Sequence, residues 1–228
     1  MNYYDTDPEF MERFEKFAFE EVVKEEGQSL EENTRYLAIL STLMGCQGIE
    51  EYQRVLPRAL DAGLTPVMVK EMVYQAVDYL GIGRVLPFLD ATNEYLISIG
   101  VALPLPGQAT TTMEDRMERG AQAQVDIFGE QMRDAWKNGH INRWLAANCF
   151  GDYYTRTGLD LKQREMITFC FLMAQGGCEP QLTAHAKGNM NLGNNKEFLI
   201  KVVSQCLPYI GYPRSLNAIT CIEHAEKQ

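Results

Sequence analysis

Several features are missing from this chain of 228 residues, and each absence excludes a kind of protein or a kind of site. No Cys-x-x-Cys pair occurs, and the spacing of the cysteines and the three histidines matches no zinc site. The longest apolar run, 166–174, is far too short to span a bilayer. The opening residues contain neither a basic nor an apolar region, so we expect no signal peptide. Nothing alternates with a period of two over a convincing length, so no sheet is expected.

Positive charge is also scarce. The formal net charge of −10 argues against a nucleic-acid groove and against a polybasic membrane-binding face. The cysteines lack the spacing of a disulfide framework, which indicates reduced thiols and a cytoplasmic protein. Apart from Cys178, they are interpreted as core residues, because buried cysteine behaves as a small hydrophobe: Cys46, Cys149, Cys170, Cys206 and Cys221. Among these, Cys46 lies at an expected helix end, between Gly45 and Gly48.

Apolar residues recur with helical spacing through most of the chain. The pattern predicts helices over 8–26, 33–44, 50–62, 66–80, 84–99, 113–136, 142–154, 161–175, from 178 onward, 195–210 and from 213 to the end. Thr65 is expected to cap the fourth of these, and Asp160 with Gln163 to form a capping box for the eighth. The segment 100–112, rich in proline and threonine, is the expected linker. The sequence therefore predicts an all-α protein.

The second half of the chain repeats the first. Arg35 recurs 129 residues later as Arg164, and Leu43-Met44 as Leu172-Met173. After one inserted residue, a Val-x-Gln-x3-Tyr-x-Gly-x2-Arg string that begins at Val73 recurs at Val203. We therefore predict a tandem duplication of a helical unit, with a first repeat over 1–99, a linker over 100–112 and a second repeat over 113–228.

The segment Gly176-Gly177-Cys178-Glu179-Pro180-Gln181-Leu182-Thr183-Ala184-His185 holds the candidate site. The two glycines end one helix, and Pro180 belongs in the first turn of the next. Cys178 should therefore lie at a helix N-terminus, where the helix dipole favours a thiolate and lowers the pKa of a cysteine. Gln181 and His185 follow on the same helical face. A thiol, an amide and an imidazole on one stripe form a candidate active site.

The first repeat lacks these three side chains. In their place it has Gly48 or Ile49, Glu51 or Tyr52, and Val55 or Leu56, depending on where the alignment gap falls. The scaffold is thus retained in both halves, whereas the reactive groups occur in one. This difference favours a functional role for Cys178 and His185.

At these residues the sequence resembles the carboxymuconolactone decarboxylase family, within the superfamily that includes the alkyl hydroperoxide reductase D subunit. The resemblance is carried by Arg164-Glu165-Met166-Ile167-Thr168, by His185-x-Lys187-Gly188 with Asn191-x-Gly193, and by Gln205-x3-Tyr209-x-Gly211-x-Pro213-Arg214. It is strong over 113–228 and weaker before. It implies an alkyl hydroperoxide reductase D-like all-helical unit and a homo-oligomer, a trimer or a hexamer-like assembly, with a site between packed helices near a subunit contact.

Two chemistries occur in this superfamily. The hydroperoxidase branch carries Cys-x-x-Cys, a histidine and a glutamate on the preceding helix. Cys178, His185 and Glu165 match those positions, while Gln181 replaces the second cysteine, so a disulfide within that motif cannot form. The decarboxylase branch keeps the histidine segment and needs no cysteine.

The first functional prediction is a thiol-dependent peroxidase in which Cys178 attacks a peroxide and a thiol reductant, a partner protein or a small molecule, resolves the sulfenic acid. A helical hairpin would set Glu165 beside Gly188, where it could orient His185, about 10 Å along the axis from Cys178 at ~1.5 Å per residue.

The second functional prediction is a cofactor-free decarboxylase of a lactone carboxylic acid. In this reaction His185 would transfer the proton, and Lys187 or Arg214 would hold the carboxylate. The third is a non-enzymatic helical assembly module. No metal or cofactor is expected. The expected substrate is a small molecule, and its predicted binding residues are Gln181, Lys187 and Arg214.

Overall fold

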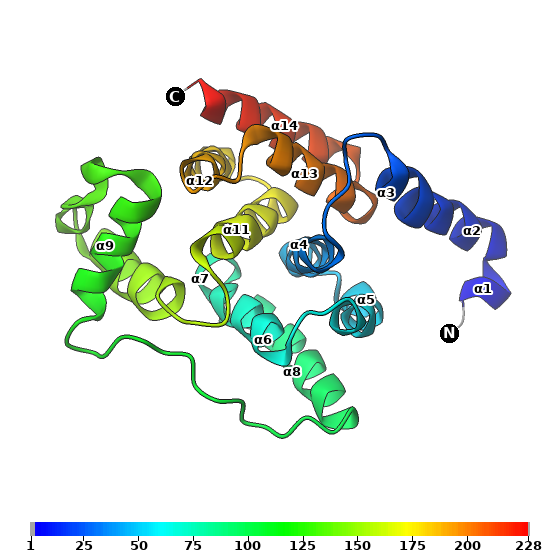
Figure 1. Ribbon diagram of the computed structural model, residues 1–228, viewed down its shortest axis with the longest axis horizontal. Coiled ribbons are helices and arrows are strands. Elements are labelled where there is room, and N and C mark those ends of the chain that lie inside the picture. The colour runs from blue at the N-terminus through cyan, green and yellow to red at the C-terminus, as the bar shows by residue number, and fades with distance from the viewer. Residues whose placement is uncertain (1–2, 228) are drawn as a thin grey trace.

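Two buried helices lie at the centre of the structure, a computed structural model that describes residues 3–227. They are α4 (Glu32–Gly45) and α11 (Leu161–Gln175), and both are buried along most of their length (Figure 1). A helix that is apolar on all sides belongs in the interior. The two come into close contact at Gly45, where an added Cβ would lie 2.7 Å from the main-chain oxygen of Phe171. The described residues form helices and contain no strand.

The other helices follow each central helix in the same order. After α4 come α5 (Ile49–Asp61), α6 (Pro66–Gln75), α7 (Val77–Leu80) and α8 (Ile82–Ser98); after α11 come α12 (Glu179–Asn191), α13 (Lys196–Ile210) and α14 (Tyr212–Glu226). In this correspondence, α6 and α7 together occupy the place of the longer α13. The predicted tandem duplication of an all-α unit is confirmed. Both repeats contribute to one core, so the division of the chain at 99 and 113 stays a prediction.

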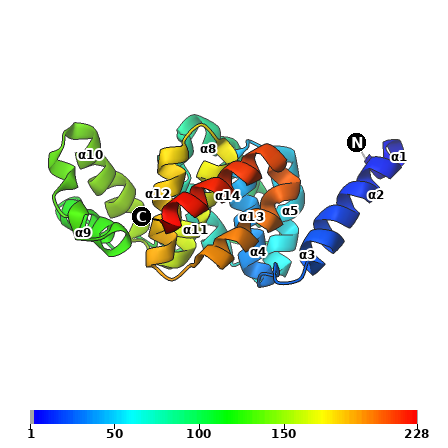
Figure 2. The same ribbon diagram turned by 90° about the horizontal axis from the view of Figure 1, so that it is seen from above.

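Each repeat also begins with a helical arm, and the two arms lie at opposite ends of the molecule (Figure 2). The first arm contains α1 (Tyr3–Thr6), α2 (Pro8–Lys16), the π-helix η1 (Phe17–Glu21) and α3 (Val22–Lys24). The second contains α9 (Arg116–Phe128), the short 3₁₀ turns η2 (Glu130–Met132) and η3 (Ala135–Lys137), α10 (His140–Trp144) and the π-helix η4 (Leu145–Tyr154). The arm of the second repeat has a small apolar core of its own.

The repeated arginines and glutamines bond across the two repeats. Arg35 donates from Nε to Gln205 Oε1 at 2.7 Å, and Arg164 donates from Nη1 to Gln75 Oε1 at 2.9 Å. All four side chains are buried, and buried polar groups require partners. The shared residues of the duplication therefore include a reciprocal pair of hydrogen bonds at the interface between the repeats.

Helix signals in the sequence were accurate where a cap was identifiable. Asp160 and Gln163 form the predicted capping box, and Thr65 accepts a hydrogen bond from the Met68 amide. The prediction of one helix over 113–136 is wrong. Helix α9 ends at Phe128 because Gly129 adopts a φ of +104°, which a right-handed helix cannot continue. The predicted helix over 142–154 is largely the π-helix η4.

Two glycines allow α9 and η4 to pack backbone against backbone. A Cβ at Gly120 would lie 1.8 Å from the Ala146 carbonyl oxygen, and one at Gly151 would lie 2.1 Å from the Arg116 carbonyl oxygen. We expect Gly120→Ala to lower the free energy of unfolding by about 1–3 kcal/mol, since the obstructing atoms are backbone. Urea unfolding measures this loss. Gly83→Ala is the control, because nothing lies within 4 Å of a Cβ there. Equal midpoints for the two variants would contradict the prediction.

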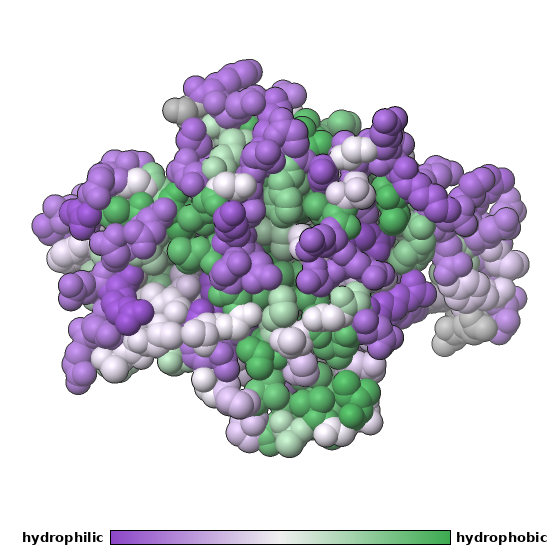
Figure 3. Space-filling model, in the orientation of Figure 1, coloured by the Kyte–Doolittle hydropathy of each residue, from purple (hydrophilic) through white to green (hydrophobic). Residues whose placement is uncertain are grey.

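Residues 101–115 connect α8 to α9 without a helix. Hydrophobic side chains gather on the surface near the C-terminal end of α8 (Figure 3), where Ile97 and Ile99 are exposed. Ile82 and Leu86 at the start of α8, and Tyr212 and Leu216 at the same positions of α14, are exposed as well. These surfaces agree with a homo-oligomer, which stays a prediction.

Candidate active site

A cavity of about 760 Å³ lies between the second arm and the packed helices of both repeats. Its walls are largely apolar, with Tyr79, Phe128, Phe150 and Leu172 among them. Four amide side chains interrupt this surface: Gln124, Gln131, Gln175 and Gln181. A mostly apolar cavity with a few converging polar groups is typical of a small-molecule site.

His185 faces this cavity from α12 and is held from behind by Glu165 of α11. The imidazole Nδ1 lies 2.9 Å from Glu165 Oε2 and 3.1 Å from Oε1, and Glu165 is fully buried. A carboxylate opposite Nδ1 makes that nitrogen the one that carries the proton. Within residues 3–227 no hydrogen-bond partner is found for Nε2, so this nitrogen is left as an acceptor beside the cavity.

Two aromatic rings fix the plane of the imidazole. Tyr79 of α7 packs edge-on against His185 at 5.5 Å between ring centroids, and Phe128 of α9 does so at 5.4 Å. Tyr79 belongs to the first repeat and Phe128 to the second arm. The site is therefore built from side chains of both repeats.

The contact between Glu165 and α12 depends on a glycine. A Cβ at Gly188 would lie 2.7 Å from Glu165 Oε2, so only glycine lets the carboxylate lie flat against the helix. Asn189 then donates to the main-chain carbonyls of Glu165 and His185. The predicted approach of Glu165 to Gly188 and to the imidazole is confirmed.

Glu165 is also the end point of a chain of hydroxyl groups. Tyr154 donates to Glu165 Oε1 at 2.8 Å, and the Tyr79 hydroxyl lies 2.9 Å from the Tyr154 hydroxyl. Thr168 Oγ1 lies 2.7 Å from the same Tyr154 oxygen. The sequence did not identify Tyr154 or Thr168 as site residues. The recurrence of Tyr79 as Tyr209 in the duplication was the available signal for Tyr79.

Cys178 is the residue before the first turn of α12, as predicted, and it lines the same cavity. Its thiol donates to the Leu172 carbonyl at 3.4 Å, and Gln175 Nε2 lies 3.8 Å from its sulfur. Burial raises the pKa of Cys178, and the hydrogen bond from Gln175, which favours the thiolate, offsets only part of that increase. The prediction of a lowered pKa is wrong, because burial of the sulfur disfavours the charged thiolate and outweighs the effects that favour it.

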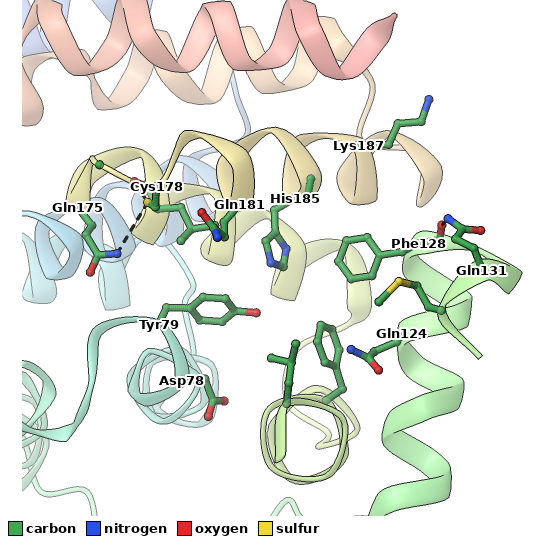
Figure 4. Close-up of a pocket in the computed structure, with 16 residues that line it drawn as sticks. Asp78, Tyr79, Gln124, Phe128, Gln131, Gln175, Cys178, Gln181, His185 and Lys187 are labelled. Atoms are coloured by element: carbon green, nitrogen blue, oxygen red, sulfur yellow. Dashed lines mark hydrogen bonds between the residues drawn. The ribbon is translucent and has the colours of Figure 1, made fainter. Parts of the chain in front are cut away.

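Of the three predicted substrate-binding residues, Gln181 and Lys187 line the cavity and Arg214 does not. Figure 4 shows Cys178, Gln181 and His185 along one side of α12, facing Tyr79, while Lys187 extends away from them at the rim. Arg214 does not line the cavity; its guanidinium packs beside Gly176. Direct contact between Arg214 and a ligand in this cavity is therefore not supported.

Residues 3–227 contain neither a cluster of metal-ligating side chains nor a helix that could span a membrane. No cluster of three or more histidine, cysteine, aspartate or glutamate side chains in that range has the arrangement of a metal site. None of its helices combines the length and apolar character needed to traverse a bilayer.

The fold of two all-helical repeats agrees with the comparison to known families. The model of the carboxymuconolactone decarboxylase family matches residues 8–94 and again residues 140–224. The chain belongs to this family.

One characterised relative is similar over part of the chain. The 4-carboxymuconolactone decarboxylase of Acinetobacter baylyi is 25% identical over 128 residues, a match that covers 50% of this chain and 89% of the relative. The match therefore covers about half of this two-repeat chain and most of the relative.

Proposed function

We propose that this protein is an enzyme that catalyses proton transfer on a small organic molecule, with His185 as the general acid–base. The observation that carries this proposal is the Nδ1–Glu165 contact, which leaves Nε2 facing the cavity. An oriented imidazole beside a mostly apolar cavity is suited to general acid–base catalysis. The printed name of the relative supports one such reaction as our proposal, the cofactor-free decarboxylation of a lactone carboxylic acid.

In that reaction the bond from the substrate carbon to its carboxylate breaks. The carboxylate leaves as carbon dioxide, the electron pair passes into the conjugated carbonyl system of the lactone, and the carbon takes up a proton. His185 would take up a proton from solvent at Nε2 and deliver it to that carbon, while Glu165 stabilises the positive charge that the ring carries in between. Lys187 is the cationic side chain among the residues that line the cavity. Because it lies at the rim, it would bind a substrate carboxylate that is still in contact with water.

Thiol-dependent peroxidase activity is the second candidate, because Cys178 and His185 line one cavity. The Cys178 sulfur would attack a peroxide oxygen, the O–O bond would break, and a sulfenic acid and an alcohol would form. An external thiol would then give a mixed disulfide and water, and a second thiol would restore Cys178. This candidate ranks second because the Cys178 thiol donates to the Leu172 carbonyl, which stabilises the unreactive protonated form.

A paired assay separates the two reactions. We would incubate the wild-type protein, Cys178→Ser and His185→Gln with lactone carboxylic acids and measure carbon dioxide release. The same variants would be given an alkyl hydroperoxide with a dithiol reductant. Decarboxylation that survives in Cys178→Ser and fails in His185→Gln supports the first candidate. Peroxide consumption that requires Cys178, with no carbon dioxide from any lactone acid, supports the second and overturns the first.

The titration of Cys178 gives an independent check. Because burial raises its pKa, we expect the rate of alkylation by iodoacetamide to reach its midpoint above the ordinary cysteine value of about 8.5. Peptide mapping by mass spectrometry follows Cys178 separately from Cys46, the other partly buried thiol. A Cys178 midpoint near pH 6 would contradict this expectation and favour the peroxidase.

A further inference from the structure

Gln124 is a buried amide in the wall of the cavity, and its carbonyl oxygen is unpaired. The side chain belongs to α9, and the residue is 2% exposed. Its Oε1 atom is buried and has no hydrogen-bond partner in residues 3–227. Buried polar atoms nearly always have partners, because leaving one unpaired costs free energy. The folded chain alone therefore does not account for an amide at this position.

The other three amides of the cavity are paired or open to solvent. Gln175 accepts a hydrogen bond from Arg84 Nη1 at 3.0 Å. Gln131 and Gln181 are exposed, so water can reach their amides. Gln124 is thus the amide that the cavity wall encloses and that the described part of the chain leaves without a partner for its oxygen.

The Gln124 side chain is directed at the same space as the imidazole. Gln124 lies one helical turn before Phe128, which packs on His185, and residues four apart share a face of a helix. Figure 4 shows the Gln124 side chain extending from α9 toward the space that His185 and Tyr79 also face, with the amide nitrogen foremost. The close packing of α9 on η4 at Gly120, one turn earlier, holds this face of α9 in place.

An enclosed amide nitrogen suits one atom of the proposed substrate, the carbonyl oxygen of the lactone. When carbon dioxide leaves, the electron pair of the broken bond passes through the conjugated system to this oxygen. The oxygen carries negative charge until the carbon takes the proton from His185. A donor already aimed at such an oxygen stabilises the charge most where water is excluded. Lys187 at the rim would bind the carboxylate, which leaves the carbonyl oxygen for Gln124.

We propose that Gln124 is a substrate-binding residue that donates from Nε2 to the carbonyl oxygen of a lactone carboxylic acid. The proposal rests on the proposed function, because it concerns the same cavity and the same class of substrate. It adds a group that selects a lactone over a cyclic acid without the carbonyl, and it gives the second arm a part in the chemistry.

A Gln124→Met variant separates a binding role from a structural one. Methionine has a similar length and no amide. Because Oε1 has no partner to lose, we expect the melting temperature of Gln124→Met to equal or exceed that of the wild type. Gln122→Met is the control on the same helix, since Gln122 is exposed and its amide bonds to Asp126. A lower melting temperature together with unchanged ligand binding would make Gln124 a structural residue and overturn the proposal.

Two unreactive probes test the contact without turnover. The first is a saturated γ-lactone with its carboxyl group on the γ-carbon, from which the ring carbonyl cannot take up the electron pair. The second is the cyclic ether acid with the same ring and no carbonyl. By titration calorimetry, we expect the wild type and Gln122→Met to bind the lactone acid about tenfold more tightly than the ether acid, as one hydrogen bond would give. Gln124→Met should bind the two acids equally.

Nitrogen-15 NMR of labelled glutamine side chains observes the same contact directly. The Gln124 Nε2 signal is assigned by its loss in Gln124→Met. It should shift when the lactone acid is added and stay in place with the ether acid, while the Gln122 signal should respond to neither. Equal binding of the two acids by the wild type, binding of neither, or a preference that persists in Gln124→Met would overturn the proposal.

Turnover distinguishes failure of this proposal from failure of the proposed function. On a lactone acid that the wild type decarboxylates, Gln124→Met should lower kcat by about 10²–10³-fold, the usual loss of one oxyanion donor. An unchanged kcat would retain the decarboxylation and overturn the role of Gln124. A preference for the lactone probe that depends on Gln124, without carbon dioxide release from any lactone acid, would retain the binding role and overturn the reaction.

Discussion

His185→Gln is expected to lower kcat for decarboxylation by about 10²–10⁴-fold, the usual contribution of a general acid–base group. Glutamine keeps a polar side chain of similar length, and its amide can still donate to Glu165. It cannot take up and release a proton at neutral pH. Because the loss falls on the chemical step, kcat should decrease much more than KM changes. Steady-state kinetics on the lactone acid that the wild type accepts would measure both values.

Two matched variants show whether such a loss belongs to the site. His224→Gln changes an exposed histidine in the last turn of α14 and should leave kcat within about twofold of the wild type, since surface substitutions rarely matter. Glu165→Gln should give an intermediate loss, because the imidazole keeps its position without the compensating charge. A His185→Gln enzyme that turns over at the wild-type rate would remove His185 from the reaction.

The sequence predicted those parts of the fold and the site that depend on local pattern. Thr65 and Asp160 are caps that contact the next turn of their own helix. Cys178, Gln181 and His185 share a face because helical spacing determines it. The duplication was visible in Arg35, and its partner Arg164, because each position makes the same cross-repeat contact.

What could not be predicted comes from groups that are distant in the chain. Tyr79 reaches His185 across 106 positions, and no local signal marks a tyrosine that will pack on an imidazole. The pKa of Cys178 is raised by burial, and the helix start that the sequence indicates at Cys178 does not reveal that burial. The Leu172 carbonyl that accepts the thiol proton belongs to α11, another helix.

Arg164→Met is expected to lower the free energy of unfolding by about 3–5 kcal/mol, the usual result of breaking a fully buried ion pair. Arg164 is completely buried, and it donates to Glu71 at 3.1 Å, to Gln75 and to the carbonyls of Arg156 and Thr157. Burial lowers the pKa of Arg164, which its contact with Glu71 opposes. Methionine fills similar space but leaves these acceptors short of a donor. Urea unfolding followed by circular dichroism measures the loss.

The duplication supplies the control for this prediction, because Arg35 occupies the same position in the first repeat. Arg35 is nearly as buried, but it donates to Gln205 and to the Ala18 carbonyl and packs on the Phe19 and Tyr36 rings. Arg35→Met therefore leaves neutral acceptors unpaired and should cost less than Arg164→Met, which leaves Glu71 dependent on the partly exposed Arg156. Adding Glu71→Gln to Arg164→Met should restore part of the stability. Equal losses at the two arginines would mean that the buried charge of Glu71 is not what makes Arg164 necessary, and that its hydrogen bonds to Gln75 and the main chain account for the whole effect.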